Sequence, residues 1–258
     1  MPNVIESLAK SYYEFYRSGV FASDQSKISI LRMEDAYAVQ RKFQQMREAD
    51  GDQPFGYKVG CTSSAIRQQF GFDDPIYGRL MTPGKYVGNV ELDHTEFYSL
   101  AIEPEFVLTM KRDVSLVPES DDELLDAIDY VQPGIELHNY VYHYDPPSRQ
   151  ELICSNGIHA AQVIGEVKVN PRDVHWTLEG VAVYKNQQLV ASGVVAEIME
   201  GPLNSLRFLL KHLAARGEVL KAGEVVIPGS ATPLIPAGPG DKITCCFTNL
   251  GEVSLCVT

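Results

Sequence analysis

The stretch AIEPEFVLTM, residues 101–110, is the part of the sequence that most restricts the fold. Its apolar residues predict a strand, and Glu103 and Glu105 lie two positions apart, so both side chains should point to the same face. Two carboxylates held this close repel each other unless a cation or a shared proton offsets the repulsion. A divalent cation that prefers oxygen ligands, such as Mg²⁺ or Mn²⁺, is one explanation, and an edge strand with its polar face in water is the other.

Composition restricts the class of protein. A chain of 258 residues can form one large domain, or one domain with a small appendage. Its net charge of −12 argues against general binding to nucleic acid or to an anionic membrane. No signal peptide and no apolar run of membrane-spanning length are visible. Five cysteines without metal-binding spacing indicate reduced thiols, and we therefore expect a cytoplasmic protein.

A lysine inside an apolar strand is the second chemical feature. In FGYKVGCTSS, residues 55–64, Lys58 has apolar and glycine neighbours, although burying its charge is costly. Lys58 is therefore paired with a carboxylate, or has a lowered pKa suited to acid–base chemistry, or lies at an edge and reaches water. Thr62 or Ser63 is expected to cap a short helix over residues 64–70.

A third polar group occurs in VQPGIELHNYVYHY, residues 131–144, which is predicted to be a strand. Glu136 and His138 lie two positions apart and should share a face, and His143 follows five residues later. A metal site of carboxylates and histidine is compatible with this pattern. A histidine among tyrosines is, however, more often a packing residue.

The remaining elements are predicted from periodicity and turn residues. Four helices are expected at residues 3–18, 33–49, about 120–127 and about 202–216. From residue 157 onward the chain is predicted to be mostly β-structure, with a hairpin near Asn186. No phosphate-binding loop and no nucleophile elbow occur in the sequence.

In order and spacing, these motifs resemble those of the fumarylacetoacetate hydrolase superfamily, in the branch of 2-oxopent-4-enoate hydratases and 4-oxalocrotonate decarboxylases. Each motif is weak alone, and their combination over nearly the whole length is specific. The matching segments are EDAYAVQR (34–41), GYKVGCTS (56–63), YGRL (77–80), IEPEFVL (102–108), GIEL (134–137), the Asn156 region, the hairpin ending in Gly193, LKAGEVVIPGS (220–230) and PGDKI (239–243).

The resemblance implies an α+β fold, a β-rich mixed-sheet roll of the fumarylacetoacetate hydrolase type with N-terminal helices. Residues 1–54 are expected to form a helical segment packed on the main domain, and residues 55–258 the catalytic β-roll domain. Members of this branch can associate, so the resemblance also implies a homo-oligomer, or a complex with a related hydratase or decarboxylase.

The implied site consists of Glu103, Glu105 and Glu136 as ligands of one Mg²⁺ or Mn²⁺ ion, with Lys58 as the catalytic residue that transfers protons. The implied function is a metal-dependent lyase in the catabolism of aromatic compounds. It would hydrate a 2-hydroxy-2,4-dienoate to a 4-hydroxy-2-oxo acid through a metal-stabilised enolate. The implied substrate-binding residues are Thr62, Ser63, Asn156, Ser230 and Thr232.

Several positions depart from the pattern that the resemblance implies. Relatives have an aspartate where this chain has Ile76, with Asp74 two residues away. They have an acidic residue and an arginine at Asn139 and Val141, and an Asn-His-Pro segment where this chain has residues 200–202. If the missing aspartate orients water, its loss favours the alternative function, a 4-oxalocrotonate-type decarboxylase at the same site. A hydrolase that cleaves a C–C bond, and a non-catalytic homologue acting as a partner subunit, are further alternatives.

Overall fold

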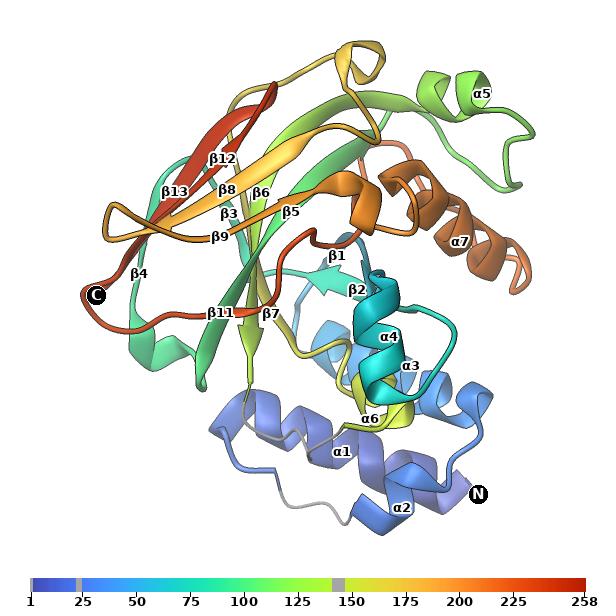
Figure 1. Cartoon of the computed structure of the whole chain (residues 1–258). Helices are drawn as coiled ribbons and strands as arrows, with labels where there is room; N and C mark the ends of the chain where they lie inside the picture. The colour runs from blue at the N-terminus through green and yellow to red at the C-terminus, as the bar shows by residue number, and fades with distance from the viewer. Residues whose placement is uncertain (1, 22–24, 141–146) are drawn as a thin grey trace.

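The computed structural model describes residues 2–21, 25–140 and 147–258. Within them the helices lie at the lower end and on the right-hand side of two mixed β-sheets (Figure 1). The α-helices are α1 (Pro2–Ser18), α2 (Gln25–Ser29), α3 (Met33–Ala49), α4 (Ser64–Phe70), α5 (Asp121–Asp126), α6 (Arg149–Cys154) and α7 (Pro202–Ala214). Short 3₁₀ segments occur at His94–Glu96, Pro171–Asp173 and Val195–Glu197. Each described helix is too short or too polar to cross a lipid bilayer.

The larger sheet has the strand order β2-β1-β10-β5-β6-β7-β3, with β11 paired to β5. The smaller sheet has the order β4-β13-β12-β8-β9. Parallel pairs (β1 with β10, β3 with β7, β13 with β4) occur among antiparallel ones, so both sheets are mixed. The strands are β1 (Pro54–Gly60), β2 (Ile76–Met81), β3 (Lys85–Val87), β4 (Val90–Leu92), β5 (Leu100–Met110), β6 (Ile128–Asn139), β7 (His159–Ile164), β8 (Gly180–Lys185), β9 (Gln188–Val194), β10 (Val225–Ile227), β11 (Ile235–Pro236), β12 (Lys242–Phe247) and β13 (Gly251–Val257). This architecture confirms the predicted α+β class.

Helices α1 to α3 and α6 gather at one end of the molecule, below the sheets in Figure 1. Helix α1 buries Leu8 and Tyr12, and α3 buries Val39 and Phe43, in the same apolar core as Ile102 of β5. Each fully buried large apolar side chain contributes about 1.5–3 kcal/mol. The helical end is thus packed on the sheets through one continuous core. The division of the chain into domains at residue 54 stays a prediction.

The predicted elements agree closely with the structure at α3 and α4. Ser63 is the N-cap residue of α4, but its side chain makes no capping hydrogen bond, so that part of the expectation is wrong. In α5 the Ser120 hydroxyl does accept the Glu123 N–H, as the capping-box pattern predicts. Helices α2 and α6 were not predicted. The strand expected over residues 131–144 ends at Asn139, and Val141 and His143 lie outside the described residues.

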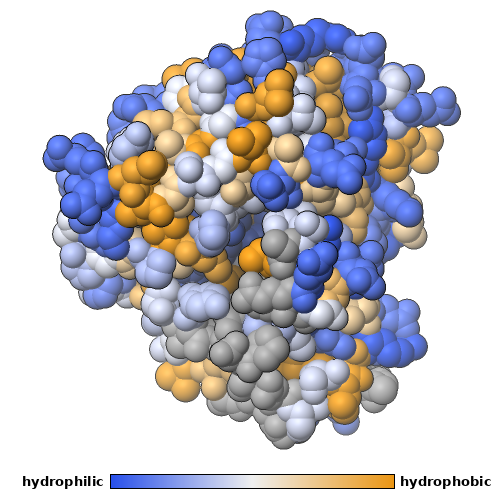
Figure 2. All heavy atoms as spheres, viewed as in Figure 1, coloured by the Kyte–Doolittle hydropathy of each residue, from blue (hydrophilic) through white to orange (hydrophobic). Residues whose placement is uncertain are grey.

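The surface seen in Figure 2 has two notable features. Hydrophobic side chains gather along β9, just inside the hydrophilic tip of the β8–β9 hairpin. Leu189 and Val190 belong to this patch and are exposed on a strand that forms the edge of the smaller sheet. Near the centre of the same face the surface is hollowed.

Candidate active site

The carboxylates come together because β5 and β6 are antiparallel neighbours. Glu103 lies directly opposite Glu136 in the ladder, and Glu105 lies opposite Gly134. Side chains two positions apart share a face, so His138 points the same way as Glu136. Ligand atoms of Glu103, Glu136 and His138 all lie within 4.8 Å of one another, a spacing that could hold a metal ion. Glu105 is not part of that group.

Glu105 lies on the buried side of the group. Its side chain is only 2% exposed, and its Oε2 accepts the Gly229 N–H at 2.9 Å. Burial, and then the nearby charges of Glu136 and Glu103, raise the pKa of Glu105 well above its usual value. This shift reflects how unfavourable a negative charge on Glu105 is in a buried position beside two other carboxylates. A cation would relieve that repulsion.

Glu136 is the centre of the polar contacts. Its Oε1 accepts hydrogen bonds from Lys58 Nζ at 2.5 Å and from His159 Nδ1 at 2.8 Å. Its Oε2 lies 3.6 Å from His138 Nε2. Burial acts to raise the pKa of Glu136, but Lys58 and the two histidines outweigh burial, so this pKa lies below its usual value. Glu136 is therefore ionised and can serve as an anionic ligand.

Lys58 projects from β1 and is 2% exposed. Burial acts to lower the pKa of Lys58, but Glu136 and then Glu103 and Glu105 outweigh it, so the pKa is raised. Of the three interpretations of this lysine, the structure supports the pair with a carboxylate. The interpretation as an exposed edge lysine is wrong.

A left-handed turn holds the second partner of Lys58. Asn156, Gly157 and Ile158 have consecutive φ values of 60°, 63° and 54°. Such values are strained for a β-branched residue such as Ile158. The turn directs the Gly157 carbonyl to Lys58 Nζ, at 3.1 Å. A Cβ at Gly157 would lie 2.9 Å from Lys58 Cε, so glycine is required for this approach.

His159 is a site residue that sequence reasoning missed. The register of β6 and β7 places it opposite His138, at a position with no motif of its own. Burial lowers the pKa of His159 to about 4, although Glu136 acts to raise it. The ring is therefore neutral, and because Glu136 is ionised, Nδ1 must carry the hydrogen that it donates. His159 thus orients Glu136 without adding a charge.

These groups fit a divalent cation. Ionised carboxylates are the preferred ligands of Mg²⁺ and Mn²⁺, and a neutral imidazole can be added for transition metals. Ligand oxygens of Glu103 and Glu136 lie close together, and burial, followed by the charges of these two carboxylates, raises the pKa of Glu105 beside them. The ligand set proposed from the resemblance, Glu103, Glu105 and Glu136, is therefore compatible with this arrangement, and whether Glu105 is a ligand stays a prediction.

A cavity of about 260 Å³ opens beside the charged group. Lys58, Glu103 and His138 form its polar wall, and Glu103 is the only acidic residue among the described residues that line it. Most of the other walls are apolar: Ile66, Ile76, Pro147, Leu152, Ile158, Pro233 and Leu234.

The departure at Ile76 has a structural consequence. Ile76 is buried and lines the cavity, whereas the Asp74 side chain is 68% exposed and pairs with Arg149 at 3.1 Å. Asp74 therefore does not replace the missing aspartate. Asn139 has another role, since its Oδ1 accepts the Tyr98 N–H at 2.8 Å.

The five predicted substrate-binding residues are absent from the described lining of this cavity. Thr62 is buried against Gly229, the residue that donates to Glu105. Ser63 begins α4. Ser230 and Thr232 contact each other just before Pro233, which does line the cavity. Their contact with substrate stays a prediction.

The Asn156 side chain forms hydrogen bonds with neighbouring protein groups. Its Oδ1 accepts the Arg79 N–H at 2.7 Å and a hydrogen bond from Gln44, and its Nδ2 donates to the Arg79 carbonyl. The side chain thus anchors the left-handed turn to β2. Sequence alone could not distinguish this anchor from a substrate ligand.

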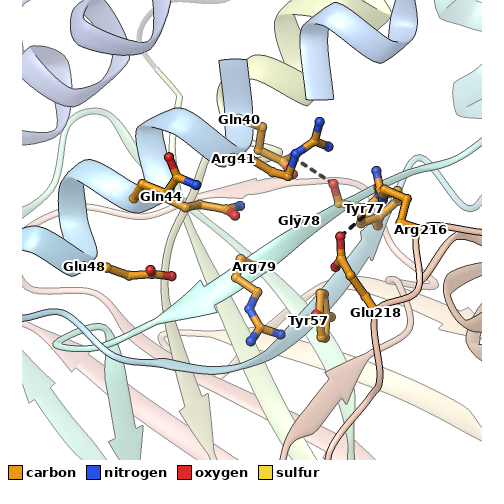
Figure 3. Close-up of a pocket in the computed structure, with 11 residues that line it drawn as sticks. Gln40, Arg41, Gln44, Glu48, Tyr57, Tyr77, Gly78, Arg79, Arg216 and Glu218 are labelled. Carbon is orange, nitrogen blue, oxygen red and sulfur yellow. Dashed lines mark hydrogen bonds and ion pairs between the residues drawn. The ribbon is translucent and has the colours of Figure 1, made fainter. Parts of the chain in front are cut away.

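A second cavity, of about 240 Å³, lies between α3 and the strands β1 and β2 (Figure 3). Arg79 stacks over the ring of Tyr57 and pairs with Glu224 at 2.9 Å. Arg216 lies 3.4 Å from Glu218. Because these arginines are paired with carboxylates, the cavity offers little net charge to a ligand. The acid–base groups converge on the first cavity.

Comparisons with known proteins agree with this site. No protein-family model matches the chain. A 2-keto-4-pentenoate hydratase of Paraburkholderia xenovorans (strain LB400) is 26% identical over 253 residues, which cover 98% of this chain and 94% of the relative. A 4-oxalocrotonate decarboxylase of Pseudomonas putida is 30% identical over 220 residues, which cover 85% of this chain and 83% of the relative.

The solved structure of 4-oxalocrotonate decarboxylase from Pseudomonas putida G7, complexed with magnesium and adipate, superimposes with a TM-score of 0.93. The match covers 100% of this chain and 98% of that chain at 27% identity. Sequence and structure thus agree over the full length. The chain belongs to the fumarylacetoacetate hydrolase superfamily, in the branch that contains hydratases and 4-oxalocrotonate decarboxylases.

Proposed function

We propose that this protein is a divalent-metal-dependent lyase for a small unsaturated 2-oxo acid. Its reaction would be the hydration of a 2-hydroxy-2,4-dienoate to a 4-hydroxy-2-oxo acid. The observation that carries the proposal is the cavity with two unlike walls, one formed by Lys58, Glu103 and His138 and the other by apolar side chains. The charged wall suits the carboxylate and 2-oxo group of the substrate, and the apolar wall suits an uncharged distal chain.

Glu103 and Glu136, with Glu105 beside them, would hold the cation, which supplies Lewis-acid polarisation of the 2-oxo group when bound. Lys58 would hold and move the proton, because its ammonium lines the cavity and is kept in place by Glu136 and Gly157. The apolar walls exclude bulk water, which strengthens the electrostatic interactions at the charged wall. Mg²⁺ and Mn²⁺ are the two proposed ions.

Decarboxylation of a 4-oxalocrotonate-type substrate is the second candidate, and Ile76 favours it. Hydration has to position a water molecule near the distal alkene carbon, whereas loss of CO₂ does not. Ile76 contributes an apolar wall to the cavity and cannot hydrogen-bond to water. The electron pair released with CO₂ would delocalise through the alkene onto the 2-oxo oxygen, and the same Lys58 would supply the proton that neutralises the resulting enolate.

A paired assay distinguishes the two reactions. The purified protein is incubated with Mg²⁺, Mn²⁺ or EDTA, and loss of dienoate ultraviolet absorbance and release of CO₂ from 4-oxalocrotonate are followed. Metal-dependent absorbance loss that Glu105→Gln and Lys58→Ala both abolish would support the hydratase. CO₂ release without hydration would support the decarboxylase. Silence in both assays despite tight metal binding would overturn the proposal and favour a non-catalytic partner subunit.

The patch on β9 supports a proposal about assembly. Leu189 and Val190 are 58% and 45% exposed, and an apolar edge strand is a common site of association. We therefore propose a homo-oligomer, or a complex with a related hydratase or decarboxylase, which light scattering would test.

All five cysteines are free, which supports the expected cytoplasmic location.

A further inference from the structure

His138 is buried among charged groups. It is 2% exposed, and within the described part of the chain neither ring nitrogen makes a hydrogen bond of good geometry. Its Nε2 lies 3.1 Å from Oε2 of Glu103 and 3.6 Å from Oε2 of Glu136. A buried polar atom without a partner costs about 1–3 kcal/mol, so an arrangement of this kind needs an explanation.

A packing role does not explain this position. A packing histidine would place at least one nitrogen against a hydrogen-bond partner, as His159 does with its Nδ1 against the Glu136 carboxylate. The Nε2 atom of His138 instead converges with two carboxylate oxygens on one point, inside a group of ligand atoms that are within 4.8 Å of one another. A cation at that point would satisfy all three atoms at once.

We propose that His138 is a nitrogen ligand of the metal, through Nε2, beside Glu103 and Glu136. This inference rests on the proposed function only in taking the site to bind a divalent metal. The two oxygens and one imidazole nitrogen form a mixed ligand set. Imidazole suits transition metals, whereas carboxylate and water suffice for Mg²⁺. The protein should therefore prefer Mn²⁺ to Mg²⁺ more strongly than a site made of oxygen ligands alone.

Pulsed electron paramagnetic resonance of the Mn²⁺-loaded protein tests the ligand directly. Electron spin echo modulation from ¹⁴N is expected in the wild type and in His159→Gln, and it should be absent in His138→Gln. The His159 variant is the matched control, because that imidazole lies in the same polar group but outside the set of converging ligand atoms. Labelling all histidines with ¹⁵N should alter the wild-type modulation, which identifies imidazole without any mutation.

Calorimetric titration supplies the second readout. His138→Gln should weaken Mn²⁺ binding by about tenfold or more, in line with the loss of a metal-site group. Mg²⁺ binding should change less, so the ratio of the two dissociation constants moves toward one. Circular dichroism verifies that His138→Gln is folded. If this variant does not fold, the electron paramagnetic resonance of the ¹⁵N-labelled wild type is the test.

The outcomes separate this inference from the proposed function. Mn²⁺ that binds without ¹⁴N modulation, or modulation that persists in His138→Gln, would overturn the nitrogen ligand and leave the lyase intact. Equal weakening of Mn²⁺ and Mg²⁺ in the variant would also count against it. Failure of the wild type to bind either ion would overturn both the ligand and the metal-dependent function.

Discussion

Lys58 Nζ lies 2.5 Å from Oε1 of Glu136, and the two side chains are only 3% and 1% exposed. The contact spans the sheet, because β10 and β5 lie between the strands that carry the two residues. A buried ion pair of this kind gains little over two well-packed apolar residues, but loss of one partner leaves an uncompensated charge. The pair is therefore better explained by chemistry than by stability.

Removal of the Lys58 ammonium should destabilise the metal-free protein. Lys58→Met should lower the free energy of unfolding by about 3 kcal/mol in EDTA, because Glu136 is left buried without its main partner. Urea unfolding measures this change. Lys221→Met is the matched control, since Lys221 pairs with Asp113 at 3.2 Å on the surface and should cost less than about 1 kcal/mol. Equal effects in the two variants would contradict the prediction.

The same variant should bind metal more tightly. Lys58 Nζ occupies the Glu136 carboxylate and places a positive charge beside the proposed cation. Two unit charges 4 Å apart interact by about 4 kcal/mol at an effective dielectric constant of 20. Loss of only a third of this repulsion would strengthen Mn²⁺ binding about tenfold. Calorimetry on Lys58→Met should show this gain together with loss of catalysis, and unchanged or weaker binding would show that lysine and metal do not compete.

Glu105 gives a third prediction. Burial and the neighbouring carboxylates raise its pKa, so its charge is unfavourable in the metal-free protein. Glu105→Gln should therefore unfold at the same or higher urea concentration in EDTA. A metal at 100 times its dissociation constant stabilises the wild type by about 2.7 kcal/mol, and Glu105→Gln should lose much of this gain because it removes a negative charge. A full metal-dependent gain in the variant would remove Glu105 from the metal site.

The sequence predicted which side chains share one face of a strand, but it did not predict which residues contact each other across strands. The two-residue period of a strand predicts that Glu103 joins Glu105, and that Glu136 joins His138, on one face. Nothing local indicates which strands are neighbours, and Lys58 meets a carboxylate 78 positions away. The resemblance placed Lys58 and the three glutamates in one site, but it did not indicate this pair.

The sequence did not indicate the residues that contribute a backbone group to the site or that reach it through the pairing of two strands. Gly229 contributes an N–H to Glu105, and Gly157 contributes a carbonyl to Lys58. His159 reaches Glu136 because β7 pairs with β6, which sequence periodicity does not reveal. Asp74 shows that closeness in sequence can also mislead. It lies two residues from the position of the missing acid, but its side chain is on the surface.

We predict that Asn156 stabilises the fold by anchoring the left-handed turn to β2, and that it does not bind substrate. Asn156→Ala leaves the N–H and carbonyl of Arg79 without their side-chain partner, at about 1–3 kcal/mol for each buried group. Alanine also tolerates the φ of 60° less well than asparagine. We expect a loss of at least about 2 kcal/mol in urea unfolding. Gln44→Ala, which removes one contact to the same amide, should cost less. A raised KM with unchanged stability would instead make Asn156 a substrate ligand.

Cys61 gives a prediction that depends on pH. Its thiol is part of the cavity lining, and burial raises the pKa of Cys61 to about 12, although Lys58 acts to lower it. Only the thiolate reacts with iodoacetamide, and a rise of the pKa from 9.0 to about 12 lowers the thiolate fraction at pH 8 by about a thousandfold. Cys61 in the folded protein should therefore be alkylated about three orders of magnitude more slowly than in urea.

Mass spectrometry of the alkylated peptides measures this rate between pH 7 and 9, where it should rise about tenfold for each unit of pH. Fast alkylation of Cys61 at pH 8 would mean that the charge of Lys58 outweighs burial at the thiol. Slow alkylation would mean that the thiol is neutral at working pH. In that case only the glutamates balance the positive charge of Lys58. Glu136 is then free to exchange its contact with Lys58 for a contact with a metal ion.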